Sequence, residues 1–143
     1  MTQEEKMLLL QDLCGRLPYG VRVWYKYSTW HSEKFATSIR LVDEKIALSS
    51  KFNKEGDWFP IEEAGEILIK PYLRPLSSMT EEEKEEYNNL YYQVPIQHNN
   101  GNAYRDTKMV EALHIDWLNR NMFDFRRLPK HLTIEALEGM YNN

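Results

Sequence analysis

The apolar positions at the start of the chain repeat first with a helical and then with a strand spacing. Thr2 and Glu5 have the spacing of a capping box, which predicts a helix over about residues 3–14 that Gly15 would end. The apolar face of this helix is expected to comprise Met7, Leu10, Leu13, Cys14 and Leu17. From residue 21 the period becomes two, which predicts a half-buried strand with Val21, Val23, Tyr25 and Tyr27 on one side and Arg22, Trp24 and Lys26 on the other.

Three more strands are expected before residue 76, with turn signals at 42–45 and 53–56 between them. The second strand carries Phe35, Thr37, Ile39 and Leu41 on one side, the third covers 46–48, and the fourth begins at 67–69. The prolines of segment 70–75 exclude a helix interior and favour an edge strand or an extended chain. Four short, closely spaced strands predict a small antiparallel meander or a partial SH3-like barrel.

The back half of the chain reads as helical. A second capping box, Thr80 with Glu83, predicts a helix to about residue 92 that Pro95 ends. The polar, turn-rich segment 97–104 is expected to be a surface loop. A third helix is predicted over 107–119, and an irregular tail or short strand that packs on the molecule follows it.

These elements indicate an α+β fold in a single domain, residues 1–143. It would consist of an N-terminal helix, about four antiparallel strands, two C-terminal helices and the tail. The β-rich front would cover 1–76 and the helical back 77–143, with the proline-rich segment 71–78 as a candidate hinge between them.

Composition narrows the class of partner and the compartment. The net charge of −4 gives no uniform attraction to nucleic acids or anionic membranes. The single cysteine excludes an intramolecular disulfide and suits a reducing compartment. No apolar run has the length of a membrane span, and the acidic start lacks the features of a signal peptide. We therefore expect a cytoplasmic protein without membrane association.

No residue pattern of the chain has the spacing of a catalytic, metal or phosphate site. Cys14 is expected to be a buried, inert thiol, although a nucleophilic pair with His114 stays open if their helices pack together. His114 and Asp116 point apart on a helix, so a histidine bonded to the backbone is favoured over a catalytic one. We expect no cofactor and no metal.

Several longer motifs resemble a family of small proteins from phages, prophages and mobile elements of gut Bacteroidales. They are Lys-Pro-Tyr-Leu-Arg-Pro-Leu-Ser-Ser-Met-Thr-Glu-Glu-Glu at 70–83, Asp-Trp-Leu-Asn at 116–119, Asn-Met-Phe-Asp-Phe-Arg at 121–126 and Ile-Glu-Ala-Leu-Glu-Gly-Met-Tyr at 134–141. The resemblance implies an accessory protein in a bacterial host cell and carries no catalytic residue. The chain departs from the pattern at His131, where glycine is usual, and a turn that needs a positive φ there would be strained.

Two groups of residues are candidate contacts for a partner. The first is the outer face of the first strand, with Arg22, Trp24 and Lys26, which Arg40 would join if the second strand pairs beside it. The alternative is that the helical half covers Trp24. The second group is a basic and aromatic run in the tail: Phe123, Phe125, Arg126, Arg127 and Lys130. Its cations would bind an anionic partner or, in the favoured alternative, neutralise the acidic helix start at 81–86 within the same chain.

These features support three hypotheses about function. The preferred one is a non-enzymatic accessory protein that binds another protein or a second copy of itself through aromatic and charged residues. The second is a nucleic-acid-binding accessory protein that uses the basic and aromatic residues, and its binding would weaken steeply with salt. The third is a small enzyme whose cleft would hold His114 or His98 beside a carboxylate.

Overall fold

The computed structural model describes residues 2–27, 29–50 and 58–141 and confirms the α+β class. The front half contains α1 (Gln3–Arg16), η1 (Leu17–Tyr19), β1 (Val21–Tyr27), β2 (Trp30–Ala36), β3 (Ser38–Val42), β4 (Lys45–Ser49), β5 (Phe59–Pro60), β6 (Glu62–Glu63), β7 (Glu66–Ile67) and β8 (Ile69–Pro75). The back half contains η2 (Leu76–Ser78), α2 (Glu81–Asn89), η3 (Leu90–Gln93), β9 (Ile96–Asn99), β10 (Asn102–Arg105), α3 (Thr107–Arg120), β11 (Phe123–Asp124), η4 (Lys130–Leu132) and β12 (Ile134–Glu135). The turn expected at 53–56 lies outside the described residues.

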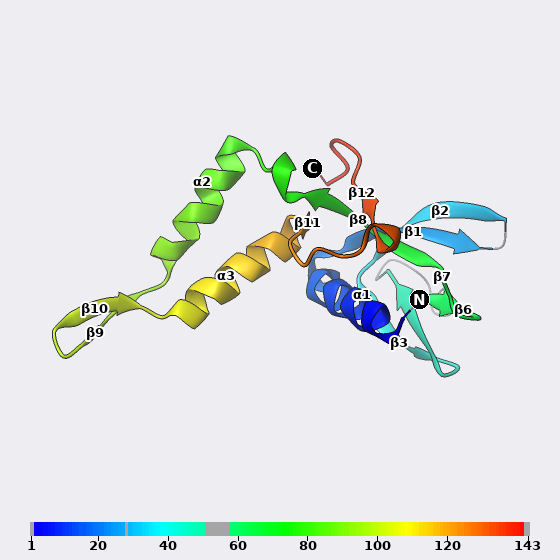
Figure 1. Ribbon diagram of the computed structural model, residues 1–143, viewed down its shortest axis with the longest axis horizontal. Coiled ribbons are helices and arrows are strands. Elements are labelled where there is room, and N and C mark those ends of the chain that lie inside the picture. Colours follow the sequence, from blue (N-terminus) through cyan, green and yellow to red (C-terminus); the bar gives the residue numbers. More distant parts are fainter. Residues whose placement is uncertain (1, 28, 51–57, 142–143) are drawn as a thin grey trace.

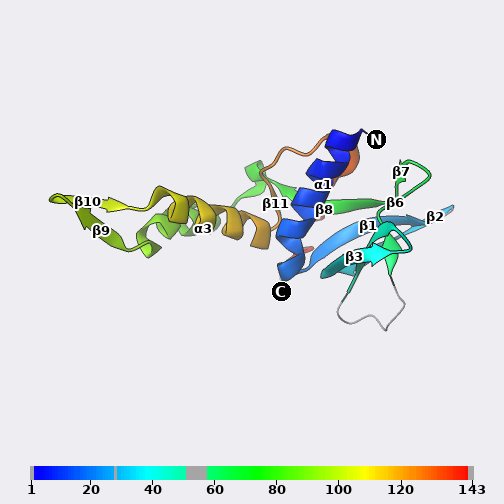
Figure 2. The same cartoon turned by 90° about the horizontal axis from the view of Figure 1, so that it is seen from below.

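The molecule has a thick part, which we call the head, and a thin part, which we call the arm (Figures 1 and 2). The head comprises the described residues of 2–78 and 121–141, and it holds α1 and the larger sheets. The arm comprises residues 81–120: α2, η3, the β9–β10 hairpin and α3. The arm extends away from the head with the hairpin at its far end (Figure 1). The chain passes from the head to the arm at residues 79–80 and returns to the head after Arg120.

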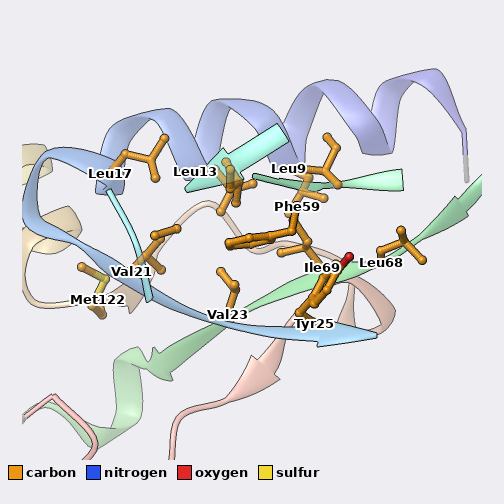
Figure 3. Packing of buried hydrophobic residues seen from close by; sticks show 13 residues of the cluster. Leu9, Leu13, Leu17, Val21, Val23, Tyr25, Phe59, Leu68, Ile69 and Met122 are labelled. Carbon is orange, nitrogen blue, oxygen red and sulfur yellow. The ribbon is translucent and has the colours of Figure 1, made fainter. Parts of the chain in front are cut away.

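The core of the head lies between α1 and the main sheet, whose strand order is β11-β8-β1-β2 with β12 also on β8. Figure 3 shows Leu9, Leu13 and Leu17 pointing from the helix side toward Val21 and Val23 of β1. All five side chains are buried. Burial of each leucine contributes roughly 1.5–3 kcal/mol. The smaller β3-β4-β5 sheet adds further core residues, among them Leu48 and Phe59.

The local signals at the start of the chain place α1 over this sheet. Thr2 Oγ1 accepts the N–H of Glu5 at 3.1 Å, as the capping box predicts. The helix passes through Gly15, so the prediction that Gly15 ends it is wrong, and Pro18 in η1 follows instead. Gly20 has φ +80°, and an added Cβ would lie 2.1 Å from the ring of Phe35. Only glycine fits at this turn.

β8 is a central strand, which corrects the prediction that its prolines would keep the segment at an edge. It pairs antiparallel with β1 and parallel with β12 and β11. Leu73 O accepts the N–H of Ala136, so odd positions of β8 face β12, whereas the N–H of Arg74, an even position, donates to Met122 O just before β11. The missing N–H of Pro71 therefore lies on the β12 side, and pairing there starts only at Tyr72. The candidate hinge at 71–78 is for the most part this strand.

The tail packs on the head, as expected. Its two short strands pair with β8, and Phe123 and Leu132 are fully buried. The positive φ in this region falls on Arg127, at 55°, while His131 lies in η4 with no such strain. No helix of the described residues combines the length and apolar character that a bilayer crossing requires.

Candidate partner-binding surfaces

The outer face of β1 carries the cations that the strand repeat predicts, and both are ion-paired. Arg22 Nη1 lies 2.7 Å from Glu33 Oε1, and Lys26 Nζ lies 2.6 Å from Glu66 Oε1. The carboxylates come from β2, the neighbouring strand, and from β7 of the separate β6–β7 pair. The face is therefore close to neutral and lacks the net positive charge of a nucleic-acid platform.

Trp24 lies in the middle of this face and is half-buried. Its ring contacts come from the adjacent strands: Lys70 Nζ is 5.2 Å and the His31 ring 5.8 Å from its centroid. The arm extends away from the head, so these strands, and not the helical half, provide the neighbours of this ring (Figure 1).

Arg40 does not join this face. The chain leaves the main sheet after Ala36, and β3, which carries Arg40, pairs with β4 in the smaller sheet. The guanidinium of Arg40 lies over the ring of Trp58, 4.2 Å from its centroid. The single alternating run of 35–41 conceals this change of sheet, because both parts keep the strand repeat.

The aromatic residues of the tail run are not a surface patch. Phe123 is fully buried and stacks on Trp117 of α3, with ring centroids 5.6 Å apart and planes 14° apart. Phe125 is half-buried, with Arg126 and Arg16 positioned 4.3 and 5.7 Å from its ring centroid. These rings join the arm to the head and are not displayed to a partner.

The basic side chains Arg126 and His131 of the tail contact carboxylates of α1, not the acidic helix at 81–86 that was expected to attract the tail cations. Arg126 Nη1 lies 2.7 Å from Asp12 Oδ1, and His131 Nε2 lies 2.6 Å from Glu5 Oε2. Of the expected basic patch, only Arg127 and Lys130 remain exposed. The pairing with α2 is made instead by Arg74 of β8, as described below.

A buried ionic network, missed from the sequence, fixes the tail to α1 close to the point where the arm meets the head. We call Asp12, Arg16 and Arg126 the anchor network. Asp12 and Arg16 are both fully buried and bind each other through two bonds of 2.9 Å, and Arg16 Nη2 also donates to Phe123 O at 2.6 Å. The i,i+4 spacing of Asp12 and Arg16 was the available signal, but such pairs are usually exposed.

Gly15 allows the close approach that this network needs. A Cβ at position 15 would lie 2.7 Å from Arg126 Nη2 and 3.0 Å from Asn119 Nδ2. Among the described residues, Arg16 Nη1 and Asn119 Oδ1 are buried without a hydrogen-bond partner. The contact between α1 and the end of α3 is thus tight and polar.

Cys14 is exposed, so the prediction of a buried thiol is wrong. The buried face of α1 passes through Leu9, Asp12, Leu13 and Arg16 and leaves Met7 and Cys14 outside. His114 Nε2 donates a 3.0 Å bond to Tyr87 O, and the imidazole ring packs on the ring of Tyr87. This confirms the backbone-bonded histidine that was favoured.

The far end of the arm displays an ordered group of large side chains. We call Tyr91, Tyr92, Ile96 and Arg105 the tip cluster. The two tyrosine rings meet edge to face at 5.3 Å, and the Arg105 guanidinium lies 4.7 and 5.2 Å from their centroids. Arg105 Nε donates to Val94 O at 3.1 Å, and Ile96 is its cross-strand partner. Tyr92 is 69% exposed and Ile96 52%.

The segment 97–104 is a β-hairpin, not the loop that its polarity predicted. β9 and β10 pair from Ile96–Arg105 to Asn99–Asn102, and Asn100 and Gly101 have φ of 52° and 83°. Asn-Gly flanked by strand-forming residues is the usual signal of a two-residue hairpin turn. The signal was present, but the many polar residues on both faces of this ribbon concealed the strand repeat.

Two cavities of about 690 and 610 Å³ lie on the head. The second holds Arg74 and Glu83, whose two bonds of 2.7 and 2.8 Å, with the Thr80 cap, lower the pKa of Glu83 to about 2. Neither His114 nor His98 lines these cavities. No three metal-ligating side chains converge anywhere within 2–27, 29–50 and 58–141.

The anchor network and the tip cluster are thus the two most specific arrangements of side chains. The first is buried and structural, and the second is exposed and ordered. A comparison of the chain with protein-family models, curated proteins and solved structures found no match.

Proposed function

We propose that this chain is a non-enzymatic accessory protein, of phage or mobile-element type, that binds another protein through the tip of its arm. The observation that carries the proposal is the tip cluster. Tyrosine and arginine are the residues that most often dominate the binding energy of protein interfaces. In the tip cluster the arginine is already bonded to the backbone and stacked on both tyrosine rings, so little side-chain entropy is lost on binding.

The surroundings of the tip cluster support a protein partner with a basic rim. α2 leads to the cluster and carries five glutamates against one lysine, and Glu83 alone among these glutamates is held by an arginine. The acidic arm would be repelled by phosphates and attracted by lysine and arginine on a partner. The partner that fits is a protein with an apolar pocket for the tyrosine and isoleucine side chains and a cationic edge beside it.

The experiment is a capture assay with Tyr92→Ala. The wild-type chain, Tyr92→Ala and Leu41→Ala are immobilised and exposed to lysate of a gut Bacteroidales host, and captured proteins are quantified by mass spectrometry. Leu41 is the matched control, because it is 70% exposed on the head and Tyr92 is 69% exposed on the arm. A protein retained by the wild type and by Leu41→Ala, and reduced at least about tenfold by Tyr92→Ala, supports the proposal. Equal retention by the two variants contradicts it.

Nucleic-acid binding is the second candidate function, and Trp24 is the observation that favours it. The half-buried ring lies beside Lys70, which forms no ion pair with a described residue, on the outer face of the sheet. A ring next to a cation can stack a base and contact its phosphate. Single-stranded oligonucleotide binding that falls steeply with salt and disappears in Trp24→Ala would establish this function. If no oligonucleotide binding is detected at low salt, this candidate function is excluded.

A further inference from the structure

β2 forms an open edge of the main sheet. The strand order places β1 on one side of β2 and no strand on the other side among the described residues. Figure 1 shows β2 at the border of the head, away from the arm. An open edge presents a row of backbone N–H and C=O groups that can pair with another strand.

The hydrogen bonds of β1 identify which residues of β2 present those groups. The N–H of Lys26 donates to Leu68 O and that of Arg22 to the Tyr141 hydroxyl, so even positions of β1 point away from β2. Odd positions of β1 therefore face β2, where their partners are Trp30, Ser32, Lys34 and Ala36. In β2 the alternate residues, His31, Glu33 and Phe35, direct their backbone groups outward.

Two side chains at the first part of this edge have unused contact capacity. Lys34 forms no ion pair with a described residue, and the Trp30 side chain is 52% exposed. The last part of β2 is different, because Ala36 is fully buried and Thr37 N donates to Ser49 O of β4. The available edge is therefore Trp30–Lys34.

We propose that a second copy of this chain pairs with β2 along this edge, antiparallel, around a two-fold axis at Ser32. In an antiparallel pair, hydrogen-bonded partners must both direct their backbone groups outward, so an odd position of one copy must face an odd position of the other. The numbers of two facing residues then add up to an even number, and the two-fold axis must pass through a residue rather than between two residues. An axis at Glu33 or Lys34 would place like charges opposite each other and would require the covered end of the strand. An axis at His31 would pair only three residues of the strand.

The axis at Ser32 gives both of these side chains a partner. Lys34 of each copy lies opposite the ring of Trp30 of the other, and Glu33 faces His31. The two Ser32 residues lie opposite each other at the axis, in a pair whose backbones approach most closely. Side-chain pairing and backbone pairing thus select the same register. The joined sheet continues through both heads and keeps both copies of α1 on one side.

The first experiment is sedimentation velocity of the wild type and of Glu33→Pro over a range of concentrations. Proline at position 33 removes an outward N–H and no bond to β1, so the head keeps its fold. We expect a reversible dimer for the wild type and at least about a tenfold weaker dimer for Glu33→Pro, with unchanged circular dichroism. A wild type that stays monomeric overturns the proposal, and so does a dimer that Glu33→Pro leaves intact.

The second experiment tests the register and decides the matter if Glu33→Pro does not fold. Cys14 is exposed and is first replaced by serine, and a single cysteine is then introduced at position 32 or at position 34. In the proposed register position 32 of one copy faces position 32 of the other. The two Cα atoms are then about 4.5 Å apart, which is within disulfide range. Ser32→Cys should give a disulfide-linked dimer under mild oxidation and Lys34→Cys should not. Equal cross-linking at both positions, or none at 32, contradicts the register.

Discussion

Asp12 is the residue on which the packing of the tail against α1 most depends. It is fully buried and accepts bonds from two arginines, Arg16 of its own helix and Arg126 of the tail. Removal of one partner from a buried ion pair leaves an uncompensated charge, which costs more than the pair itself contributes. Here the loss of one carboxylate would leave two guanidinium groups against each other.

Asp12→Ala should lower the free energy of unfolding by roughly 3–5 kcal/mol. The measurement is urea denaturation, followed by far-UV circular dichroism. Glu4→Ala is the control, because Glu4 is an exposed carboxylate of the same helix. If both variants unfold at the same urea concentration, the anchor network does not hold the tail against α1.

The predicted face of α1 shows what the sequence can and cannot reveal about single residues. Leu13 and Leu17 were placed correctly, because leucines at helical spacing are usually buried. Cys14 was placed inside and is exposed, whereas Asp12 and Arg16 were ignored and are buried. A buried charge becomes favourable only through a partner far away in the sequence, here Arg126, and local spacing contains no information about that partner.

At the scale of elements, the start of α2 is tied to the central strand of the head. Glu83 accepts two bonds from Arg74 of β8 and completes the capping box with Thr80. Its pKa is lowered to about 2, first by the hydrogen bonds from Arg74. Because the folded-state pKa is depressed, the ionised form is stabilising above the ordinary value of 4.5, and that contribution is lost as the pH falls toward 2.

The stability difference between the wild type and Glu83→Gln should therefore depend on pH. We expect the wild type to be more stable at pH 6, to lose part of this advantage at pH 3 and to lose nearly all of it at pH 2. Urea midpoints at the three pH values measure the effect. Glu82→Gln, which removes an exposed neighbour without an ion pair, should show no such trend. A difference that stays constant from pH 6 to pH 2 would contradict the role of the Arg74 contact.

The β9–β10 hairpin depends on its turn. Gly101 has φ +83° and open space around it, so a side chain there meets no clash but strains the backbone. Gly101→Val should cost about 1–2 kcal/mol in the hairpin and leave the global unfolding midpoint unchanged, because this ribbon is exposed over nearly its whole length. NMR chemical shifts of residues 96–105 measure the local effect. Gly101→Asn, which tolerates a positive φ, should keep the hairpin.

Elements were predictable where a local signal sufficed. Both capping boxes gave the helix starts correctly, at Thr2 and Thr80, because a cap is made within four residues. The sheet order was beyond the sequence. The central place of β8 depends on β12, which lies far later in the chain and is two residues long. Such short strands form only because the sheet is already present to pair with them.

At the scale of the whole molecule, the core of the arm is a small cluster in which Leu90 packs with Trp117 and Leu118. α2 has no buried residue, and the buried residues of α3 lie at the end that meets the head: Trp117, Leu118 and Asn119. Residues with few buried contacts open more readily than those in a packed core. The arm should therefore be the part of the chain that is most easily reshaped by a bound partner.

Amide hydrogen exchange should show this difference directly. We expect α2 and the hairpin to exchange well before β1, while the last turns of α3 remain protected with the head. Mass spectrometry of peptides covering 81–105 and 21–27 provides the comparison. Equal protection in both regions would mean that the arm is as rigid as the head, and binding would then rest on a preformed shape.

The connection between β8 and β11 has a consequence for how this fold can vary. The two strands are parallel neighbours, so the chain must travel back between them, and the arm is that crossover. Its two helices leave and re-enter the head at adjacent strands. Insertion of matching turns into both would move the tip outward by about 1.5 Å per residue and leave the strand pairing untouched. The distance between the tip and the head can thus be changed, by selection or by design, separately from the stability of the head.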